Sequence, residues 1–427
     1  VLTPSVGRAV LRFDTSDVKL GNYHWHFNEG NYISLEGKKI VTNNLTFSSL
    51  DQSIYVSSYL KGDTSTSVKL TLANTSISDF TGIFTNKMRD LKGYINGSIV
   101  LEDVFSKPTI YADMVAEDFM LGNQMIGDVN IETDVDDEKK RINVYASVKS
   151  AVYKGNYNSL EAEGYISTDP EHPDMEIDVL ANHLNLNFLN YPFFERYVKN
   201  VRGYAKIDAK VYGTLKKPLL SGEVTLVDDT VTVSFLNTTY HAFNQKVRLD
   251  EHGFDMDGLT LYDVDNNLLY GNGRINHESF KKFALDLNVT TKRAQFLNTT
   301  EKLSPNFYGV AYGEGKVTFS GPFNLPVIEA TATTGKGTWV RLPITSSYET
   351  NKYGFYKFVD PTKDTTVIIT QKDLKLNGLD FTLNVTATPD ARMDIVLDPV
   401  AGDILTTSGA GDIILKLPRN ANMVING

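Results

Sequence analysis

Residues 203–213 read Gly-Tyr-Ala-Lys-Ile-Asp-Ala-Lys-Val-Tyr-Gly, and this alternation indicates the fold class. Four apolar residues alternate here with three charged ones: Ala205, Ile207, Ala209 and Val211 against Lys206, Asp208 and Lys210. Successive side chains of a β-strand point to opposite faces of the sheet, so the pattern predicts a strand with one apolar and one charged face. The apolar face must lie against something apolar, either a second sheet or a ligand.

The same alternation recurs along most of the 427 residues, and the abundant Tyr, Phe, Val, Ile and Thr favour strands, so we predict an all-β fold. We expect the apolar face to contain Ile95, Ile99, Leu101, Ala205, Ile207, Ala209, Val211, Val224, Leu226, Val231, Val233, Phe235, Leu285, Leu287, Val317, Phe319, Leu383, Val385, Ile395, Leu397, Ile413 and Leu415. Turns are expected at residues 134–140, 228–229 and 263–267, which are rich in Asp and Asn. A slip of one residue would move a strand's apolar set to the other face.

A long internal repeat accompanies the strands. Phe80, Phe188 and Phe296 are spaced by 108 residues, and each lies between an apolar strand and a strand that glycine begins. The glycines that begin these strands are Gly93, Gly203, Gly313 and, in a shorter fourth copy, Gly409. Such a period predicts one continuous array of stacked units over residues 1–427, with approximate repeats at 1–80, 81–188, 189–296 and 297–427.

Two segments lack the alternation and are predicted to be short amphipathic helices, at residues 79–92 and 188–200. The first has Asp79 as its expected N-cap, and the second has Pro192 in its first turn. Each precedes a strand that glycine begins, so the helices either cover the apolar face or control access to it. In the second segment, the side chains expected to act as the gate are Phe188, Phe193, Phe194, Tyr197 and Val198.

Composition excludes several classes of function. The net charge of −10 disfavours nucleic acid, which basic residues bind, and also disfavours adhesion to anionic membrane surfaces. The chain has no cysteine, so disulfides, thiol nucleophiles and Cys-ligated zinc are impossible. No apolar run reaches the roughly 18 to 20 residues of a membrane-spanning helix. Because the sequence begins without Met and ends within a strand pattern, we interpret it as a piece of a longer protein.

Catalytic and metal-binding patterns are weak. His24 and His26 share a strand face at a spacing that two metal ligands can have, but no third ligand follows nearby. Residues 263–267 (Asp-Val-Asp-Asn-Asn) resemble the start of a calcium loop, yet the later ligands are not at EF-hand spacing, so a polar turn explains them better. No arrangement of Ser, His and Asp suggests a catalytic triad. We therefore expect no enzymatic activity, no cofactor and no metal site.

Longer motifs carry a resemblance to a known family. Residues 222–240 (Gly-Glu-Val-Thr-Leu-Val-Asp-Asp-Thr-Val-Thr-Val-Ser-Phe-Leu-Asn-Thr-Thr-Tyr), 307–321, 335–343 and 376–403 resemble the C-terminal region of TamB-type proteins, which belong to the AsmA-like family of Gram-negative bacteria. The resemblance extends from about residue 200 to residue 427 and is looser before that. It implies an elongated repeating β-groove, or β-taco, with an apolar interior and a few short amphipathic helices.

The resemblance also implies a function and partners. TamB-type proteins, part of the translocation and assembly module, are thought to bridge the periplasm and to carry phospholipids between the inner and outer membranes, supporting outer-membrane biogenesis. The implied partners are phospholipids, an outer-membrane TamA-type barrel with POTRA domains, and the inner membrane through an anchor outside this chain. Nucleic acid is not among them.

Two alternatives stay open. The chain could be a scaffold for assembly of outer-membrane β-barrel proteins, in which an exposed strand such as residues 412–417 templates incoming strands. It could also be a surface adhesion or carbohydrate-binding β-array that uses Tyr- and Asn-rich loops such as residues 348–356. A mutation in the apolar face would impair a lipid carrier, whereas a mutation at a sheet edge would impair a scaffold.

Overall fold

A computed structural model describes residues 2–5, 8–14, 16–21, 23–61, 65–84, 90–105, 108–150, 158–195, 197–304, 307–343, 380–398, 402–419 and 424–426. The chain divides into two units. Unit 1 comprises Val1–Thr232, Ala242–Met256 and His277–Lys281; unit 2 comprises Val233–His241, Asp257–Asn276 and Lys282–Gly427. Strands make up nearly all of the regular structure, which confirms the predicted all-β class.

Unit 1 begins with a small four-stranded antiparallel sheet in the order β1-β2-β5-β6. Its strands are β1 (Leu2–Ser5), β2 (Arg8–Leu11), β5 (Tyr32–Glu36) and β6 (Lys39–Asn43). An aromatic cluster packs at this end of the unit: Trp25 is fully buried, stacks on Phe47 at 5.0 Å between ring centroids, and meets the edge of Phe80 at 5.1 Å. Aromatic rings bury large apolar areas, so this cluster anchors the first strands.

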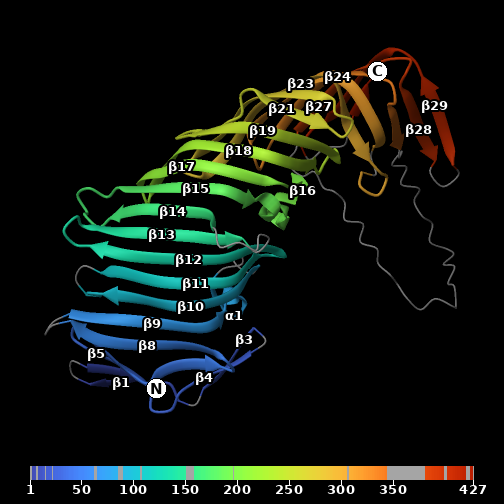
Figure 1. Ribbon diagram of the computed structural model, residues 1–427. Helices are drawn as coiled ribbons and strands as arrows, with labels where there is room; N and C mark the ends of the chain where they lie inside the picture. Colours follow the sequence, from blue (N-terminus) through green and yellow to red (C-terminus); the bar gives the residue numbers. More distant parts are fainter. Residues whose placement is uncertain are drawn as a thin grey trace, which may run out of the picture. The chain divides into compact units, whose positions relative to one another are not determined.

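The main sheet of unit 1 consists mostly of long antiparallel strands, together with a few short ones (Figure 1). They are β3 (Asp17–Leu20), β4 (Tyr23–Phe27), β7 (Leu45–Ser49), β8 (Gln52–Lys61), β9 (Ser65–Ser76), β10 (Leu91–Glu102), β11 (Thr109–Leu121), β12 (Gln124–Asp136), β13 (Arg141–Ser150), β14 (Asn158–Ser167), β15 (Met175–Asn185), β16 (Val198–Arg202), β17 (Tyr204–Thr214) and β18 (Lys217–Val233). Each strand from β7 to β15 pairs with the next in chain order, β15 pairs with β17, and β17 pairs with β18.

The helical segments are shorter than the sequence predicts. They are α1 (Ile77–Phe84), the 3₁₀-helix η1 (Leu186–Asn190) and α2 (Pro192–Glu195). Asp79 lies in the first turn of α1 rather than at its N-cap, and β10 already begins at Leu91, while residues 85–89 of the expected helix lie outside the described residues. The prediction that the helix continues to residue 200 is wrong. Residues Val198–Arg202 form β16 instead, because the β-branched Val198 and Val201 favour a strand.

Unit 2 contains a second set of strands. Wholly within it are β21 (Leu259–Asp263), β24 (Tyr308–Pro322), β25 (Val327–Thr334), β26 (Trp339–Pro343), β27 (Asp380–Ala387), β28 (Arg392–Asp398), β29 (Asp403–Ser408), β30 (Gly411–Leu417) and β31 (Val424–Asn426). The remaining strands are β20 (Gly253–Asp255), which belongs to unit 1, and β19 (Thr238–Asp250), β22 (Leu268–Glu278) and β23 (Lys281–Thr299), which like β18 contribute residues to both units. β25 pairs with β27 in parallel, as does β26 with β28. Parallel pairing requires a long connection, and residues 344–379 intervene here.

The predicted turns have mixed outcomes. β12 and β13 are joined by a turn that begins after Asp136, and β21 and β22 are joined by a turn after Asp263, as predicted. The turn at residues 228–229 is wrong, because β18 continues through both aspartates to Val233. The glycines expected to begin strands lie directly before β17 at Gly203, inside β10 at Gly93, inside β24 at Gly313, and between β29 and β30 at Gly409.

Candidate functional site

A single row of cross-strand partners crosses the main sheet of unit 1. From β7 to β18 the register joins Phe47, Ile54, Leu72, Gly97, Met114, Ile131, Ala146, Ala162, Val179, Ala209 and Gly222. Every member is apolar or glycine, and cross-strand partners lie on the same face of a sheet. We call this set the apolar row.

The next row of the ladder, one residue over on each strand, is polar. It joins Thr46, Tyr55, Thr71, Ser98, Asp113, Glu132, Tyr145, Glu163, Asp178, Lys210 and Ser221. We call this set the polar row. Lys210 donates to Glu176 at 2.6 Å and lies 3.5 Å from Asp178, and the bond to Glu176 raises the pKa of Lys210. The two rows give the sheet one apolar and one charged face, because adjacent residues of a strand point opposite ways.

Parallel rows on the apolar face contain many of the predicted residues. Ile207 lies opposite Ala181 and Val224, and Val211 lies opposite Ile177 and Leu220. Ala205 pairs with Leu226, and in β10 the residues Ile95, Ile99 and Leu101 lie opposite Ala116, Ala112 and Ile110 of β11. The structure thus places these predicted residues on one face. The sequence prediction omitted the members from β11 to β15, although the same alternation, as in Ile177-Asp178-Val179, marks them.

The apolar face is only partly covered by the described residues. Most of its predicted residues, including Ile95, Ile99 and Val211, are half-buried, and among the predicted residues only Ala205 and Ala209 are buried. In a closed β-sandwich the inward side chains of both sheets interdigitate and are buried. The exposure therefore leaves area on this face for an apolar ligand.

The segment η1 covers one part of the face. Leu186 forms a buried cluster with Val201 and Ala205, and Phe188, Leu189, Val198, Ile207, Val224, Leu226 and Val231 pack against it. Of the residues predicted to form a gate, Phe188 and Val198 thus contact the apolar face, and Phe194 and Tyr197 are half-buried. Phe193 lies in α2, and its side chain is outside the described part of the chain. The contacts make η1 a cover; a gating role stays a prediction.

Unit 2 has an apolar face of its own. One row joins Leu287, Phe319, Ile328, Phe381 and Leu417, and a second joins Val289, Val317, Ala330, Leu383 and Leu415. Val385 and Ile413 pair beside them, and Leu285 lies on the same side of β23 as Leu287. Phe235 packs edge-on against Phe381 and Phe307, at 6.0 and 5.6 Å between centroids. Val233, the last residue of β18, is half-buried.

The comparison with known families concerns this second unit. The family model of the TamB C-terminal domain matches residues 257–427. The chain carries a TamB C-terminal domain. The match confirms the resemblance drawn from residues 307–321, 335–343 and 376–403, whereas residues 222–240 lie before the matched region. No curated protein and no solved structure matches the chain. The TamB domain includes β21 to β31, and therefore both apolar rows of unit 2.

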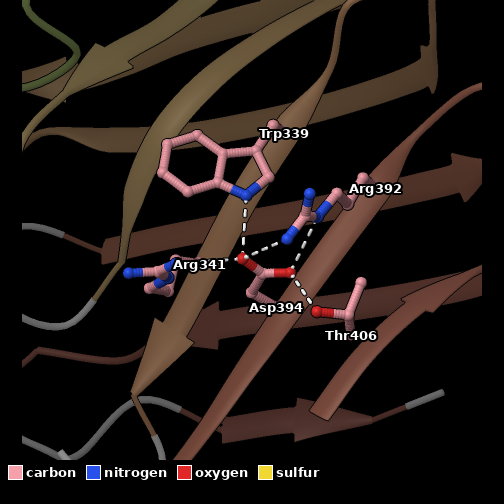
Figure 2. A network of polar contacts seen from close by, with 5 residues as sticks. All are labelled: Trp339, Arg341, Arg392, Asp394 and Thr406. Carbon is pink, nitrogen blue, oxygen red and sulfur yellow. Dashed lines mark hydrogen bonds and ion pairs between the residues drawn. The ribbon is translucent and has the colours of Figure 1, made fainter. Parts of the chain in front are cut away.

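A buried carboxylate ties together three strands of the TamB domain (Figure 2). Asp394 is fully buried and accepts hydrogen bonds from Trp339 Nε1 at 2.9 Å, Arg341 Nη2 at 3.1 Å, Arg392 Nε at 3.0 Å and Thr406 Oγ1 at 2.8 Å. Burial acts to raise the pKa of Asp394, but these bonds outweigh it and hold the pKa well below its usual range. We call these five residues the Asp394 network. The carboxylate is saturated by partners, so the network is structural.

The network sets the phase of β28. Asp394 and Val396 are both buried, whereas Leu397, predicted for the apolar face, is 56% exposed. Ile395 lies opposite Leu342 and Leu405 and is half-buried. The more buried side of β28 therefore carries Asp394 and Val396. The alternation alone did not indicate which side of β28 is buried, because both sides of the strand contain apolar residues.

The weak metal and calcium patterns have structural explanations in the TamB domain and in unit 1. Asp263 accepts hydrogen bonds from the amides of Asp265 at 2.9 Å, Asn267 at 2.8 Å and Gln295 at 2.8 Å, so its oxygens hold a polar turn, as predicted. His24 lies 2.9 Å from a carboxylate oxygen of Asp17 on the exposed surface. Among the described residues no group of three or more metal-ligating side chains could hold a metal ion. Nor does any described helix have the length and apolarity to cross a membrane.

A second buried carboxylate lies in unit 1, outside the TamB domain. Asp229 is 7% exposed, and Gly203 adopts φ of +121°, so that a Cβ at this position would collide with the Asp229 carboxylate. Burial raises the pKa of Asp229 to about 6; the amides of Val227 and Tyr204 approach the carboxylate and oppose that shift. Neither reaches good hydrogen-bond geometry, since both oxygens lack a hydrogen-bond partner among the described residues.

Asp229→Asn is expected to remove a pH dependence of stability. The folded-state pKa of about 6 exceeds the ordinary aspartate pKa of 3.8, so ionisation costs the folded state on the order of 3 kcal/mol. The wild-type free energy of unfolding therefore falls as pH rises from about 4 to about 6. Melting temperatures at pH 5 and pH 7.5 check this: the isosteric amide is expected to raise the melting temperature at pH 7.5 and to flatten the profile. Asp208→Asn, at an exposed position of β17, is the control; parallel profiles for wild type and Asp229→Asn would contradict the argument.

Proposed function

We propose that this chain carries phospholipids along its apolar faces as a non-enzymatic part of a periplasmic bridge between the inner and outer membranes. The observation that supports the proposal most directly is the apolar row, which continues over eleven strands, from β7 to β18, without a polar member. The half-exposed side chains of this face leave room for acyl chains. The TamB C-terminal domain in unit 2 agrees with a role in translocation and assembly or in lipid transport.

The energetics suit a carrier. Each methylene group that leaves water for an apolar surface gains about 0.8 kcal/mol. An uninterrupted row offers similar lining at every strand, so an acyl chain meets no deep trap as it moves. The phosphate and its attached group stay in water, which avoids the high cost of burying a charge. In this proposal the partners are phospholipids, a TamA-type outer-membrane barrel, and the inner membrane through an anchor outside the chain.

A scaffold for the assembly of outer-membrane proteins is the second candidate. Its sequence-based support was the strand at residues 412–417, but β30 pairs with β27 on one side and β31 on the other, so it is no free edge. The strand that favours this candidate instead is β29, whose residues are all exposed, with Ile404 at 43% and Leu405 at 53%. The loop at residues 348–356, on which the adhesion alternative depends, lies outside the described residues.

Lipid photo-crosslinking at neighbouring positions tests the proposal. A photoreactive amino acid replaces Ile131 or Val179 of the apolar row, or the adjacent Glu132 or Asp178 of the polar row, in the chain produced in cells. We expect phospholipid adducts, detected by mass spectrometry, at the first pair and few at the second, because only one face is apolar. Equal crosslinking on both faces, or none on either, would refute the carrier and leave the scaffold.

A further inference from the structure

A polar pocket lies over β11, β12, β13 and β14, which are neighbours in the main sheet of unit 1 (Figure 1). Its volume is about 670 Å³, which lies in the usual range for sites that bind small ligands. Glu132 and Tyr145, two members of the polar row, line it together with Asn130 and Ser147. We call it the β13 pocket. It lies on the face of the sheet opposite to the apolar row.

The lining of the β13 pocket is acidic. Glu117, Asp118, Asp128 and Glu132 supply four carboxylates, and Lys149 is the only cation among the described lining residues, so these side chains have a net charge of −3. Within the described part of the chain, none of these five side chains takes part in an ion pair. The carboxylates can therefore accept further hydrogen bonds from a positively charged ligand.

The carboxylates are spread along the strands rather than gathered at one point. Asp128 and Glu132 lie near opposite ends of the pocket on β12, and the rise of a strand separates their Cα atoms by roughly 13 Å. The described side chains include no set of three or more ligating groups that could hold a metal ion. An elongated ligand with several positive groups matches this lining better than a single metal ion does.

A buried hydroxyl group lies between these two carboxylates. Ser147 is 3% exposed and is the cross-strand partner of Asn130, which is midway between Asp128 and Glu132. Ser147 lines the pocket and has the same orientation on β13 as Tyr145, so its side chain points into the pocket. Its hydroxyl makes no hydrogen bond to any described residue. A buried polar group is stabilised by a hydrogen-bond partner, and a serine oxygen accepts from an ammonium group.

Tyr145 adds an aromatic wall to the pocket. Its hydroxyl accepts a hydrogen bond from Asn158 Nδ2 at 3.2 Å, and its cross-strand partner is Glu132. The face of a tyrosine ring attracts a cation. The pocket therefore combines carboxylates, a hydroxyl and an aromatic ring, and each of these groups favours an amine as the ligand.

We infer that the β13 pocket binds a linear aliphatic polyamine, with its terminal ammonium groups at Asp128 and Glu132 and an inner amine at Ser147. The methylene segments of the ligand lie against Tyr145. Lys149, the cross-strand partner of Asp128, weakens this binding because it repels the nearer ammonium group. The inference goes beyond the proposed function and does not depend on it, since the pocket and the apolar row lie on opposite faces of the sheet.

Isothermal titration calorimetry of the full 427-residue chain with spermidine tests the inference. We expect one spermidine per chain, and we expect Asp128→Asn with Glu132→Gln to weaken the affinity about tenfold, because two ion pairs are lost. Lys149→Gln is expected to strengthen the affinity about threefold, because a repulsive charge is removed. The control is Asp208→Asn with Glu163→Gln, which makes the same change of charge at exposed positions of the polar face outside the pocket and is expected to keep the wild-type affinity.

A second variant keeps the test decisive if the double substitution disturbs the strands. Ser147→Ala changes no charge and is expected to weaken spermidine binding about threefold, because the inner amine loses its acceptor. Unchanged affinity in both pocket variants, or equal weakening in the double pocket variant and the control, would overturn the site, because spermidine would then bind through the overall negative charge of the chain. If a trilysine peptide, which has the same net charge as spermidine, binds more tightly and depends on the same residues, the polyamine assignment is wrong and the pocket takes a basic segment of a partner protein.

Discussion

Asp394→Ala is expected to lower the free energy of unfolding of unit 2 by about 3 to 5 kcal/mol. The substitution removes the acceptor of four side chains from three strands and leaves Trp339 Nε1 and the Arg341 guanidinium partly buried without it. A buried donor that loses its partner costs more than the hydrogen bond was worth, because it gains no contact with water in exchange. Urea unfolding, combined with hydrogen exchange resolved by peptide, measures the change and assigns it to β26 and β28.

The control for this prediction is Asp390→Ala, which removes an exposed carboxylate from the turn that precedes β28. We expect it to change stability by less than about 0.5 kcal/mol. The stabilisation by the Asp394 network depends on pH. The pKa of the Asp394 carboxyl in the folded state lies below that of an unfolded aspartate, so the stabilisation is present above about pH 4 and is lost only as the pH falls further. Unchanged exchange of β26 and β28 in Asp394→Ala would mean that the network does not hold these strands together.

The alternation of residues 203–213 predicted the apolar face of β17 because the period of a strand is fixed at two. Ile207 and Val211 therefore share a face, and the antiparallel register then places Val224 and Leu220 opposite them. The prediction also holds in unit 2, where Leu383 and Leu415 pair. The alternation identifies the two faces of a single strand, and this does not depend on which strands are its neighbours.

The phase of β18 is a feature that the local sequence pattern does not predict. Leu226 and Val231 both pack on the cluster under η1, although they are five positions apart, an odd spacing, so the strand changes phase between them. The sequence suggested a turn at residues 228–229 because two aspartates usually lie in solvent. Asp229 is instead buried against Gly203, a contact between residues of different strands that no local pattern contains.

The Asp394 network was unpredictable for a related reason. Trp339 and Asp394 are 55 positions apart, and they meet because β26 and β28 pair in parallel across a long connection. The segments containing both residues were noted for their family resemblance, but the sequence did not show which strands pair. The cluster of Leu186, Val201 and Ala205 depends in the same way on how η1 folds back onto β16.

Ile207→Asp with Val211→Asp is expected to reduce the phospholipid that copurifies with the chain by more than tenfold. Both side chains lie on the apolar face, opposite Val224 and Leu220, where an acyl chain has to pass. An ionised carboxylate on this face either loses its water when the acyl chain arrives or keeps its water and excludes the chain. Each alternative costs several kcal/mol of binding free energy. A loss of about 1.4 kcal/mol already lowers the affinity tenfold. Extraction and mass spectrometry of bound lipid, normalised to protein, measure the effect.

Two further variants make this result interpretable. Ser221→Asp with Thr225→Asp adds the same charge to β18 on the opposite face, where Lys210 and Lys206 are the partners, and is expected to retain wild-type lipid. Because Ile207 also packs against the cluster under η1, Ile177→Asp with Val211→Asp repeats the test away from that cover, and circular dichroism verifies that the strands persist. If both apolar-face variants stay folded and keep their lipid, the acyl chains do not lie on this face, and the exposed strand β29 becomes the place to examine.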